Sequence, residues 1–235
     1  MKMRIIILLT AFLISGCNQS NDTNTTTPAG DNAEVVNVYD EPMHKLVFED
    51  KSFKILDVQI SPGDTTLFHL HENPVLFVSM GLQQGAEQEY NSSEWMPIDA
   101  WAKGGFQSDL TYLDEPLKHR VTNLDDDPSR LIAIMNMGNE MNRSQDQGNY
   151  EISDNWFRAK RLFLDPGDRL GFGDLSFPTV LVLISDGTLQ IVDDGQEIEI
   201  DTIWHVLEND QLLINSSAGR IEVIQAEILD DQSAY

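Results

Sequence analysis

Residues 62–71 of this chain read PGDTTLFHLH, and they combine a turn, the start of a strand and two histidines. Pro-Gly is a common centre of a tight turn, and the alternating residues that follow it are typical of a β-strand. On a strand, residues i and i+2 lie on the same face, about 7 Å apart at their Cα atoms. His69 and His71 can therefore direct two imidazoles towards one metal ion.

The same stretch recurs later in the chain. A shift of 104 residues places Pro62-Gly63-Asp64 on Pro166-Gly167-Asp168, and the agreement continues without a gap. The further matched pairs are Phe53 with Phe157, Phe68 with Phe172, Pro74 with Pro178, and Val78 with Val182. Self-similarity at a fixed offset indicates a structural repeat. It predicts two domains in tandem, at residues 34–145 and 150–235, with a linker in the polar segment 139–154.

The folded part of the chain is predicted to be all-β. From residue 34 onward it consists of short alternating or β-branched runs separated by turns, and few stretches show a helical period. The clearest runs lie at residues 53–60, 75–80, 130–135, 180–185, 188–192, 198–203 and 220–226. This pattern favours a sandwich or a barrel in each domain.

A third histidine, His119, begins the sequence His-Arg-Val-Thr-Asn, which ends at Asn123 just before another apolar run. Three imidazoles on adjacent strands would hold a divalent ion and leave coordination positions open. In the second copy, Gly173 and Leu175 stand where His69 and His71 stand in the first. The second domain is therefore expected to bind no metal of this type and to serve packing or assembly.

Two further histidines have no place in this cluster. His205 is the histidine of the second copy and has no His-x-His partner. His44 precedes the predicted barrel, and we expect it to be exposed to solvent or to act as a cap.

These residues resemble the two motifs of the cupin superfamily. Gly63, His69 and His71 match the first motif, and His119 and Asn123 match the second. In the first motif a glutamate also follows the second histidine after three or four intervening residues, where this chain has Val75 or Leu76. The second motif's glycine, proline and glycine are replaced here by Ser108, Asp114 and Pro116.

The resemblance implies two tandem jelly-roll barrels, a bicupin, with one divalent metal ion (Fe, Zn, Mn or Ni) inside the first barrel. It assigns His69, His71 and His119 as metal ligands. A three-histidine site is similar to those of the thiol and diketone dioxygenases of this superfamily. The resemblance therefore implies an oxygenase or isomerase, and the alternative is a non-catalytic ligand-binding, sensory or structural protein.

A long insertion, residues 81–108, separates the two motifs and carries Trp95, Trp101 and Phe106. It could cover the barrel mouth and line a substrate pocket, or it could form an aromatic plug. We place Leu76, Trp101, Phe106 and Asn123 in the pocket. Because histidines are neutral ligands, the metal would keep its full charge, which predicts a small anionic substrate. A homodimer is compatible with this organisation.

Composition excludes several classes of function. The 235 residues contain 15 Lys and Arg against 39 Asp and Glu, a formal charge of −24. Nucleic-acid binding needs clustered positive charge and is excluded. The single cysteine, Cys17, rules out a scaffold of internal disulfides.

The N-terminus is typical of a bacterial lipoprotein signal. Lys2 and Arg4 precede an apolar run that ends in Ile14-Ser15-Gly16-Cys17, which resembles a lipobox. Residues 1–16 are then a signal peptide, Cys17 is the lipidation site, and residues 17–33 form a polar tether. Asn18 resembles the default signal for the outer membrane. We therefore expect a cell-envelope protein anchored by lipid, facing the periplasm or the cell surface.

Overall fold

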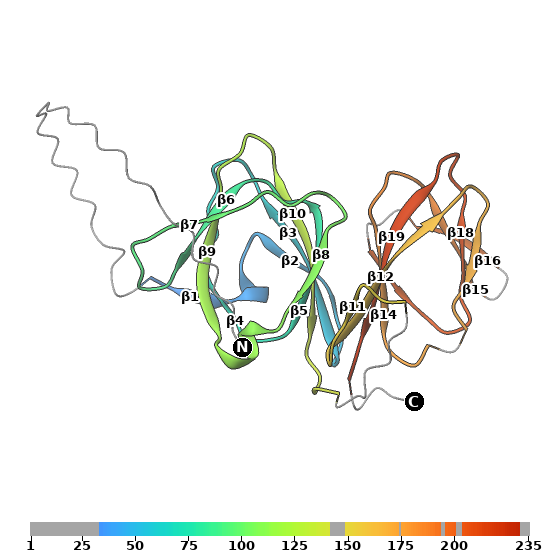
Figure 1. Ribbon diagram of the computed structural model, residues 1–235, viewed down its shortest axis with the longest axis horizontal. Coiled ribbons are helices and arrows are strands. Elements are labelled where there is room, and N and C mark those ends of the chain that lie inside the picture. The colour runs from blue at the N-terminus through green and yellow to red at the C-terminus, as the bar shows by residue number, and fades with distance from the viewer. Residues whose placement is uncertain (1–32, 142–148, 174, 194–195, 201–203, 231–235) are drawn as a thin grey trace, which may run out of the picture.

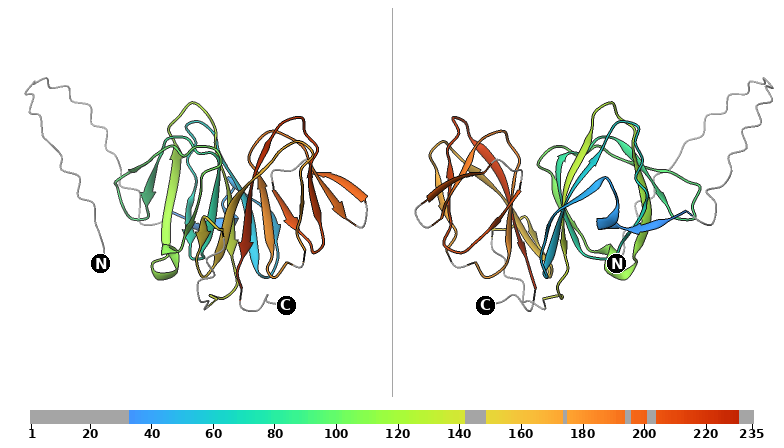
Figure 2. Two further views of the ribbon diagram at one scale, coloured as in Figure 1. Left: turned by 45° about the vertical axis from the view of Figure 1, so that its right-hand side comes forward. Right: turned by 180° about the vertical axis from the view of Figure 1, so that it is seen from behind.

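The computed structural model describes residues 33–141, 149–173, 175–193, 196–200 and 204–230. The proposed signal peptide, Cys17, most of the tether and part of the predicted linker lie outside these residues. Within the described residues, no helix is both long enough and apolar enough to cross a bilayer. Two β-barrels stand side by side, and the views from the front and from behind agree on this arrangement (Figures 1 and 2).

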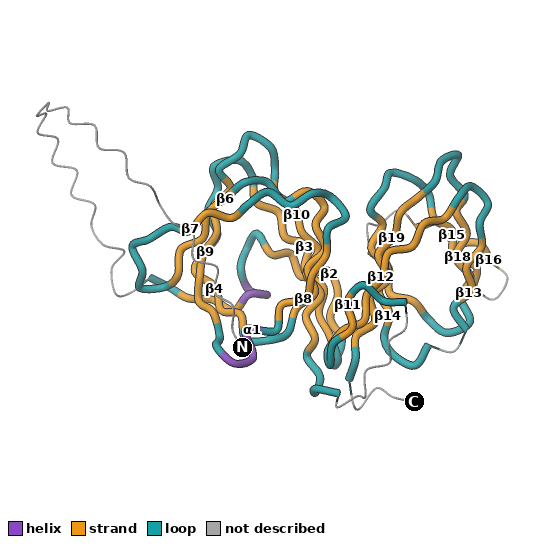
Figure 3. The backbone as a smooth tube through the Cα atoms, in the orientation of Figure 1, coloured by secondary structure: helices purple, strands orange, loops and turns teal. Residues whose placement is uncertain are grey.

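The first barrel is made from two facing five-stranded sheets. One sheet has the order β1 (Val35–Asn37), β4 (Phe68–His71), β9 (Leu117–Asn123), β6 (Gly85–Glu89) and β7 (Met96–Ile98). The other has the order β2 (His44–Glu49), β3 (Phe53–Ile60), β10 (Ser129–Asn136), β5 (Val75–Gly81) and β8 (Phe106–Asp109). The helical elements of this half are short: η1 (Val38–Asp40) and α1 (Thr111–Asp114), both small against the strands (Figure 3).

The second barrel repeats this plan with fewer strands. One sheet has the order β11 (Ile152–Ser153), β12 (Phe157–Leu164), β19 (Ile221–Ile228), β14 (Thr179–Leu183) and β17 (Trp204–Leu207). The other has the order β13 (Arg169–Gly171), β18 (Leu212–Asn215), β15 (Leu189–Asp193) and β16 (Gln196–Ile200). The prediction of an all-β chain with two tandem jelly-roll barrels is confirmed.

The repeat seen in the sequence is also present in the backbone geometry. Strands β3 and β12 begin and end 104 residues apart, and β5 and β14 begin 104 residues apart. The turns between these strands contain Gly63 and Gly167, whose φ angles are 76° and 82°. This left-handed conformation strains residues that have a Cβ, which explains why both copies have glycine there.

The two copies also share an asparagine that closes the barrel. Asn123 Nδ2 donates to the carbonyls of Ile60 and Asp127, at 3.0 and 2.8 Å. Asn215 Nδ2 donates in the same way to the carbonyls of Leu164 and Gly219. The offset here is 92 residues instead of 104, because β10 begins 54 residues after the start of β5, whereas β19 begins 42 residues after the start of β14.

The two barrels share one hydrophobic core. Strands β3, β5 and β10 pack face to face against β12, β14 and β19, as the close approach of these strands in Figure 1 shows. The buried members of this shared core are Phe53, Ile55, Leu76, Val78, Ile132, Ile134, Trp156, Phe157, Ala159, Val180, Val182, Ile184, Ile224, Ala226 and Ile228. Asn136 Nδ2 crosses between the barrels and donates to the carbonyls of Trp156 and Leu229.

The shared core corrects the prediction that Leu76 lines the pocket. Side chains alternate along β5, so Val75 and Phe77 face the interior of the first barrel while Leu76 and Val78 face the second barrel. Leu76 is fully buried there.

Truncation of Leu76 tests this placement. We expect Leu76→Ala to lower the free energy of unfolding by about 2–5 kcal/mol, because it leaves a cavity between the barrels. Leu124→Ala is the control: Leu124 is 67% exposed, so its loss should cost within about 0.5 kcal/mol. Both are measured by urea unfolding of the full chain. Equal effects of the two substitutions would contradict the shared core.

Candidate metal centre

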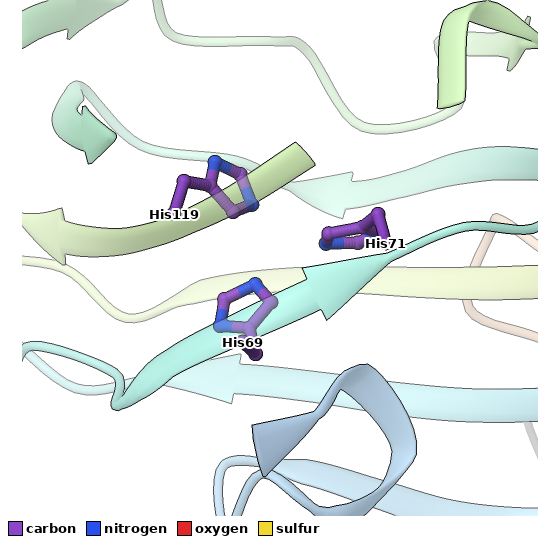
Figure 4. A group of neighbouring side chains, drawn as sticks. All are labelled: His69, His71 and His119. Atoms are coloured by element: carbon purple, nitrogen blue, oxygen red, sulfur yellow. The ribbon is translucent and has the colours of Figure 1, made fainter. Parts of the chain in front are cut away.

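His69, His71 and His119 converge inside the first barrel. His69 and His71 lie on one face of β4, and β9 places His119 directly opposite His69. One ring nitrogen from each histidine lies within 4.8 Å of those of the other two. The ring centroids are 4.7 to 5.1 Å apart, and Figure 4 shows the three rings facing a common space.

All three rings are removed from solvent: the relative exposures of His69, His71 and His119 are 1%, 7% and 7%. Burial, together with the nearby His44 and His119 rings, lowers the pKa of His69 to about 2. Burial likewise lowers the pKa of His71 well below its usual range. Both rings are therefore neutral at physiological pH and keep a lone pair that can bind a metal.

Hydrogen bonds determine which nitrogen is available in the His69 and His119 rings. His69 Nδ1 lies 3.0 Å from the Leu67 carbonyl, which can only accept, so Nδ1 carries the proton and Nε2 is free. His119 Nδ1 donates to Glu87 Oε2 at 2.9 Å. That bond lowers the pKa of Glu87. Metal-binding histidines usually donate their second N–H to a carbonyl or carboxylate in this way.

His119 Nε2 supplies a test of whether these residues suit a metal ion. It is buried and has no hydrogen-bond partner, a condition that it shares among the described side chains with Arg158 Nε alone. An unpartnered buried polar atom is costly unless something binds it. A divalent ion between the three rings would satisfy it, so the residues fit the metal that the cupin resemblance implies.

Glu87, on β6, is a residue of the site that the sequence analysis did not identify. It is not the glutamate of the first cupin motif, because it lies 16 positions after His71 and contacts His119 through Nδ1. Val75 occupies the position of the motif glutamate, because it lines the cavity, whereas Leu76 faces the second barrel. No local pattern marks Glu87, because only the pairing of β6 with β9 brings it to His119.

The expectation that His44 is exposed to solvent is wrong. It is 5% exposed and lines the same cavity. Its ring meets His69 edge to face at 4.6 Å, and its Nδ1 donates to the Val38 carbonyl at 2.9 Å. The strand β2 and the turn η1 cover this side of the barrel and carry His44 inward. Burial lowers its pKa, and the neighbouring Glu41 opposes that effect.

The histidines open onto a cavity of about 290 Å³ in the first barrel. Much of its wall is apolar and comes from Val38, Leu56, Val58, Ile60, Val75, Phe77, Leu82, Ile98, Trp101, Val121, Leu131, Ala133 and Met135. Tyr112 also lines it and stacks on His71 with ring centroids 4.7 Å apart. Burial raises the pKa of the Tyr112 phenol above its usual range, so it stays protonated.

Of the four predicted pocket residues, Trp101 lines the cavity and the other three do not. Leu76 and Phe106 pack against the core between the barrels. On β8 it is Gln107 and Asp109 that contribute to the cavity wall. Asn123 is 1% exposed, and its amide is used by the barrel closure described above.

Trp95, on the same insertion, stands away from the cavity. It is 40% exposed, and the Arg120 guanidinium lies over its ring at 5.1 Å. The insertion is therefore neither a complete lid nor an aromatic plug, since one of its aromatic residues reaches the cavity and the others do not.

The second barrel lacks this site in its described residues. Leu175, at the position of His71, packs with an apolar cluster that fills the interior. The buried members of that cluster are Leu164, Phe172, Leu181, Leu189, Ile191, Leu207, Leu213, Ile221 and Val223. At an offset of 92 residues, the buried Gln211 stands where His119 stands in the first copy. His205 lies on β17, and its side chain falls outside the described part of the chain.

No protein-family model matches the sequence, and no curated protein matches it. Solved structures do match the fold. AerE from Microcystis aeruginosa has a TM-score of 0.54 at 13% identity, over 81% of this chain and 99% of AerE. A cupin 2 conserved barrel domain protein from Leptotrichia buccalis has a TM-score of 0.50 at 11% identity, over 78% and 86%.

Salicylate 1,2-dioxygenase from Pseudaminobacter salicylatoxidans also matches, with a TM-score of 0.53 at 8% identity, over 75% of this chain and 71% of the dioxygenase. These structural neighbours are cupin-family proteins. At such identities the likeness concerns the fold. The described part of this chain therefore has the fold of the cupin superfamily, in two tandem copies.

Proposed function

We propose that the first barrel binds one divalent metal ion through His69, His71 and His119. The observation that carries this proposal is the convergence of three buried imidazoles around the unpartnered His119 Nε2. The Leu67 carbonyl and Glu87 hold two of the rings by their Nδ1 atoms. Such contacts orient a ring before the metal arrives.

We further propose that the metal centre acts on a small organic anion with an apolar body, as an oxygenase or isomerase. A divalent ion held by three neutral ligands keeps its double charge and supplies Lewis acidity to a bound anionic group. Val75, at the position of the family's glutamate, adds no countercharge. The apolar wall of the cavity suits the remainder of the ligand. Salicylate, after which one structural neighbour is named, belongs to this class of compound.

The residues around the proposed metal have distinct tasks. Glu87 accepts a hydrogen bond from Nδ1 of His119 and so holds that ring in place. Tyr112 stacks on His71 and limits its rotation. Trp101 and the aliphatic wall exclude water from the ligand's apolar part, which strengthens electrostatic contacts at the metal.

A non-catalytic role is the second candidate, and Val75 favours it. A site that has lost the family's glutamate could serve to bind or sense a ligand. Single-turnover spectroscopy of the iron-loaded protein with candidate organic acids distinguishes the two. A substrate-dependent spectral change followed by product supports catalysis, and a change without product supports binding alone.

We also propose that the protein is anchored in the bacterial cell envelope by lipid on Cys17. The support is the lipobox-like sequence Ile14-Ser15-Gly16-Cys17 and the polar segment that follows. Removal of Lys2 and Arg4 with the signal would change the formal charge from −24 to −26. That charge opposes adsorption to anionic lipid headgroups, so attachment would depend on the acyl chains.

Metal content tests the ligand assignment. In protein purified without a histidine tag, we expect about one divalent ion per chain. His71→Ala should lower the metal affinity by more than about 100-fold, because loss of a residue that only hydrogen-bonds a metal ligand already lowers it by about 10–100-fold. His205→Ala, in the second barrel, is the control and should keep the parent's metal content. The measurement is elemental analysis after dialysis. A His71→Ala protein with the parent's stoichiometry would refute the site.

Substitution of Val75 tests the charge argument. Val75→Glu should tighten cobalt binding and weaken azide binding to the cobalt-loaded protein, each by about tenfold, because the new carboxylate cancels one unit of charge. Val75→Gln matches it in size without the charge and should show neither effect. Both constants come from absorbance titrations. Equal behaviour of the Glu and Gln variants would contradict the role of charge.

Cell fractionation tests the anchor. We expect the parent in the membrane fraction and Cys17→Ala in the soluble fraction, because the variant cannot receive acyl chains. Asn18→Ala retains the cysteine and serves as the control, so it should remain in membranes. A Cys17→Ala protein that sediments with membranes as the parent does would rule out this anchor.

A further inference from the structure

The loop at residues 99–105 connects the cavity of the first barrel to the surface of the second. It joins β7, at the outer end of the first barrel, to β8, beside the second barrel (Figure 1). Trp101 in this loop lines the cavity. Its carbonyl accepts from Ser79 Oγ at 2.7 Å and from the Leu82 amide at 3.1 Å.

The Trp101 indole packs on Gly105, the second of two consecutive glycines. A Cβ added to Gly105 would lie 2.1 Å from Trp101 Nε1, so the ring packs directly on this backbone. Gly104 has a φ of +85°, a conformation that disfavours other residues. Its amide donates to the Ser79 carbonyl at 2.8 Å. The position of the Gly104–Gly105 turn therefore sets the position of the indole.

Arg161 of the second barrel holds this turn. Its Nη2 donates to the Gly104 carbonyl at 2.7 Å, and its guanidinium is paired with Glu222 on the neighbouring strand β19. It also lies over the Phe106 ring, 5.4 Å from the centroid. A Cβ on Gly104 would come within 2.8 Å of Glu222 Oε1 and 3.0 Å of Ile184 Cγ2, so the turn fits closely against the second barrel.

We propose that Arg161 is a positioning residue through which the second barrel fixes the Trp101 wall of the cavity in the first. This rests on the proposed function in one respect: the wall is taken to shape a ligand bound at the metal. The histidines lie on β4 and β9, in the opposite sheet of the barrel. Arg161 therefore acts on the part of the ligand that extends away from the metal, and not on the metal.

The duplicated structure shows that this contact is particular to Arg161. At the repeat offsets of 104 and 92 residues, Arg161 and Glu222 correspond to Asp57 and Arg130, which form an ion pair of reversed polarity at 2.7 Å. The Asp57–Arg130 pair joins β3 and β10 of its own barrel, and Gln59 donates to it. The second barrel's pair has an arginine on the strand where the first has an aspartate, and so supplies the donor that Gly104 needs.

The first experiment uses metal-free full-length protein. Acrylamide quenching of Trp101 is obtained as the difference between each protein and its Trp101→Phe counterpart. We expect Arg161→Met to raise the Trp101 quenching constant by roughly twofold or more, because the turn is released to local opening. Arg220→Met is the matched control: Arg220 is an exposed arginine of the second barrel that is paired with Asp165, and its loss should change nothing.

The second experiment compares two anions on the cobalt-loaded protein. Benzoate has a ring that would reach the Trp101 wall, whereas azide contacts the metal alone. We expect Arg161→Met to weaken benzoate by about threefold to tenfold and to leave the affinities for azide and cobalt unchanged. Gly104→Ala, which disturbs the same contact from the first barrel, should reproduce this pattern if the arginine variant does not fold.

The outcomes separate this inference from the metal proposal. Weaker benzoate binding with unchanged azide binding in Arg161→Met supports the positioning role. Higher Trp101 quenching in that variant supports it too, even if the protein binds no cobalt. Parent-like quenching in both variants overturns the inference whether or not the metal site exists. Equal weakening of benzoate, azide and cobalt would also overturn it, because that pattern reports general loss of structure.

Discussion

The burial of strands β3, β5 and β10 on both faces is the constraint on which the rest of the structure depends. One face of this sheet bounds the cavity, and the other packs against β12, β14 and β19 of the second barrel. Since side chains alternate along a strand, each neighbouring pair of residues is divided between the two environments. Val75 and Leu76 illustrate this division, because one meets the histidine cavity and the other meets the second barrel.

The histidine cluster is an electrostatic arrangement that burial makes possible. An imidazolium in an apolar interior is costly, and the lowered pKa values of His69 and His71 express that cost. The His69 and His71 rings therefore remain neutral with a lone pair available, and the Glu87 carboxylate accepts a hydrogen bond from Nδ1 of His119. A cluster of this kind is suited to a metal ion, because a neutral imidazole offers a lone pair to the metal and a protonated imidazole does not.

The second barrel keeps the backbone features of the first and replaces its chemistry. Gly167 and Asn215 repeat the turn and the closure made by Gly63 and Asn123. Leucines and isoleucines, together with Phe172 and Val223, fill the interior instead of histidines. The second barrel supplies a hydrophobic face to the shared core and, through Arg161, a hydrogen bond to the loop of Trp101. Its contribution is thus made across the interface and not inside its own barrel.

The sequence alone determined the fold class, the duplication and the three histidines, because each depends on spacing within a strand or on a constant offset between copies. The sequence did not decide whether Val75 or Leu76 occupies the position of the missing glutamate. The turn after His71 interrupts the alternation of side chains, so the faces of β4 cannot be extrapolated to β5. Only the tertiary structure decided for Val75. In the same way it turned Phe106 towards the second barrel and assigned Asn123 to barrel closure. It also buried His44 and brought Glu87 and Arg161 to partners 32 and 57 residues away. Such contacts arise from strand pairing and from packing between barrels, and neither leaves a local pattern in the chain.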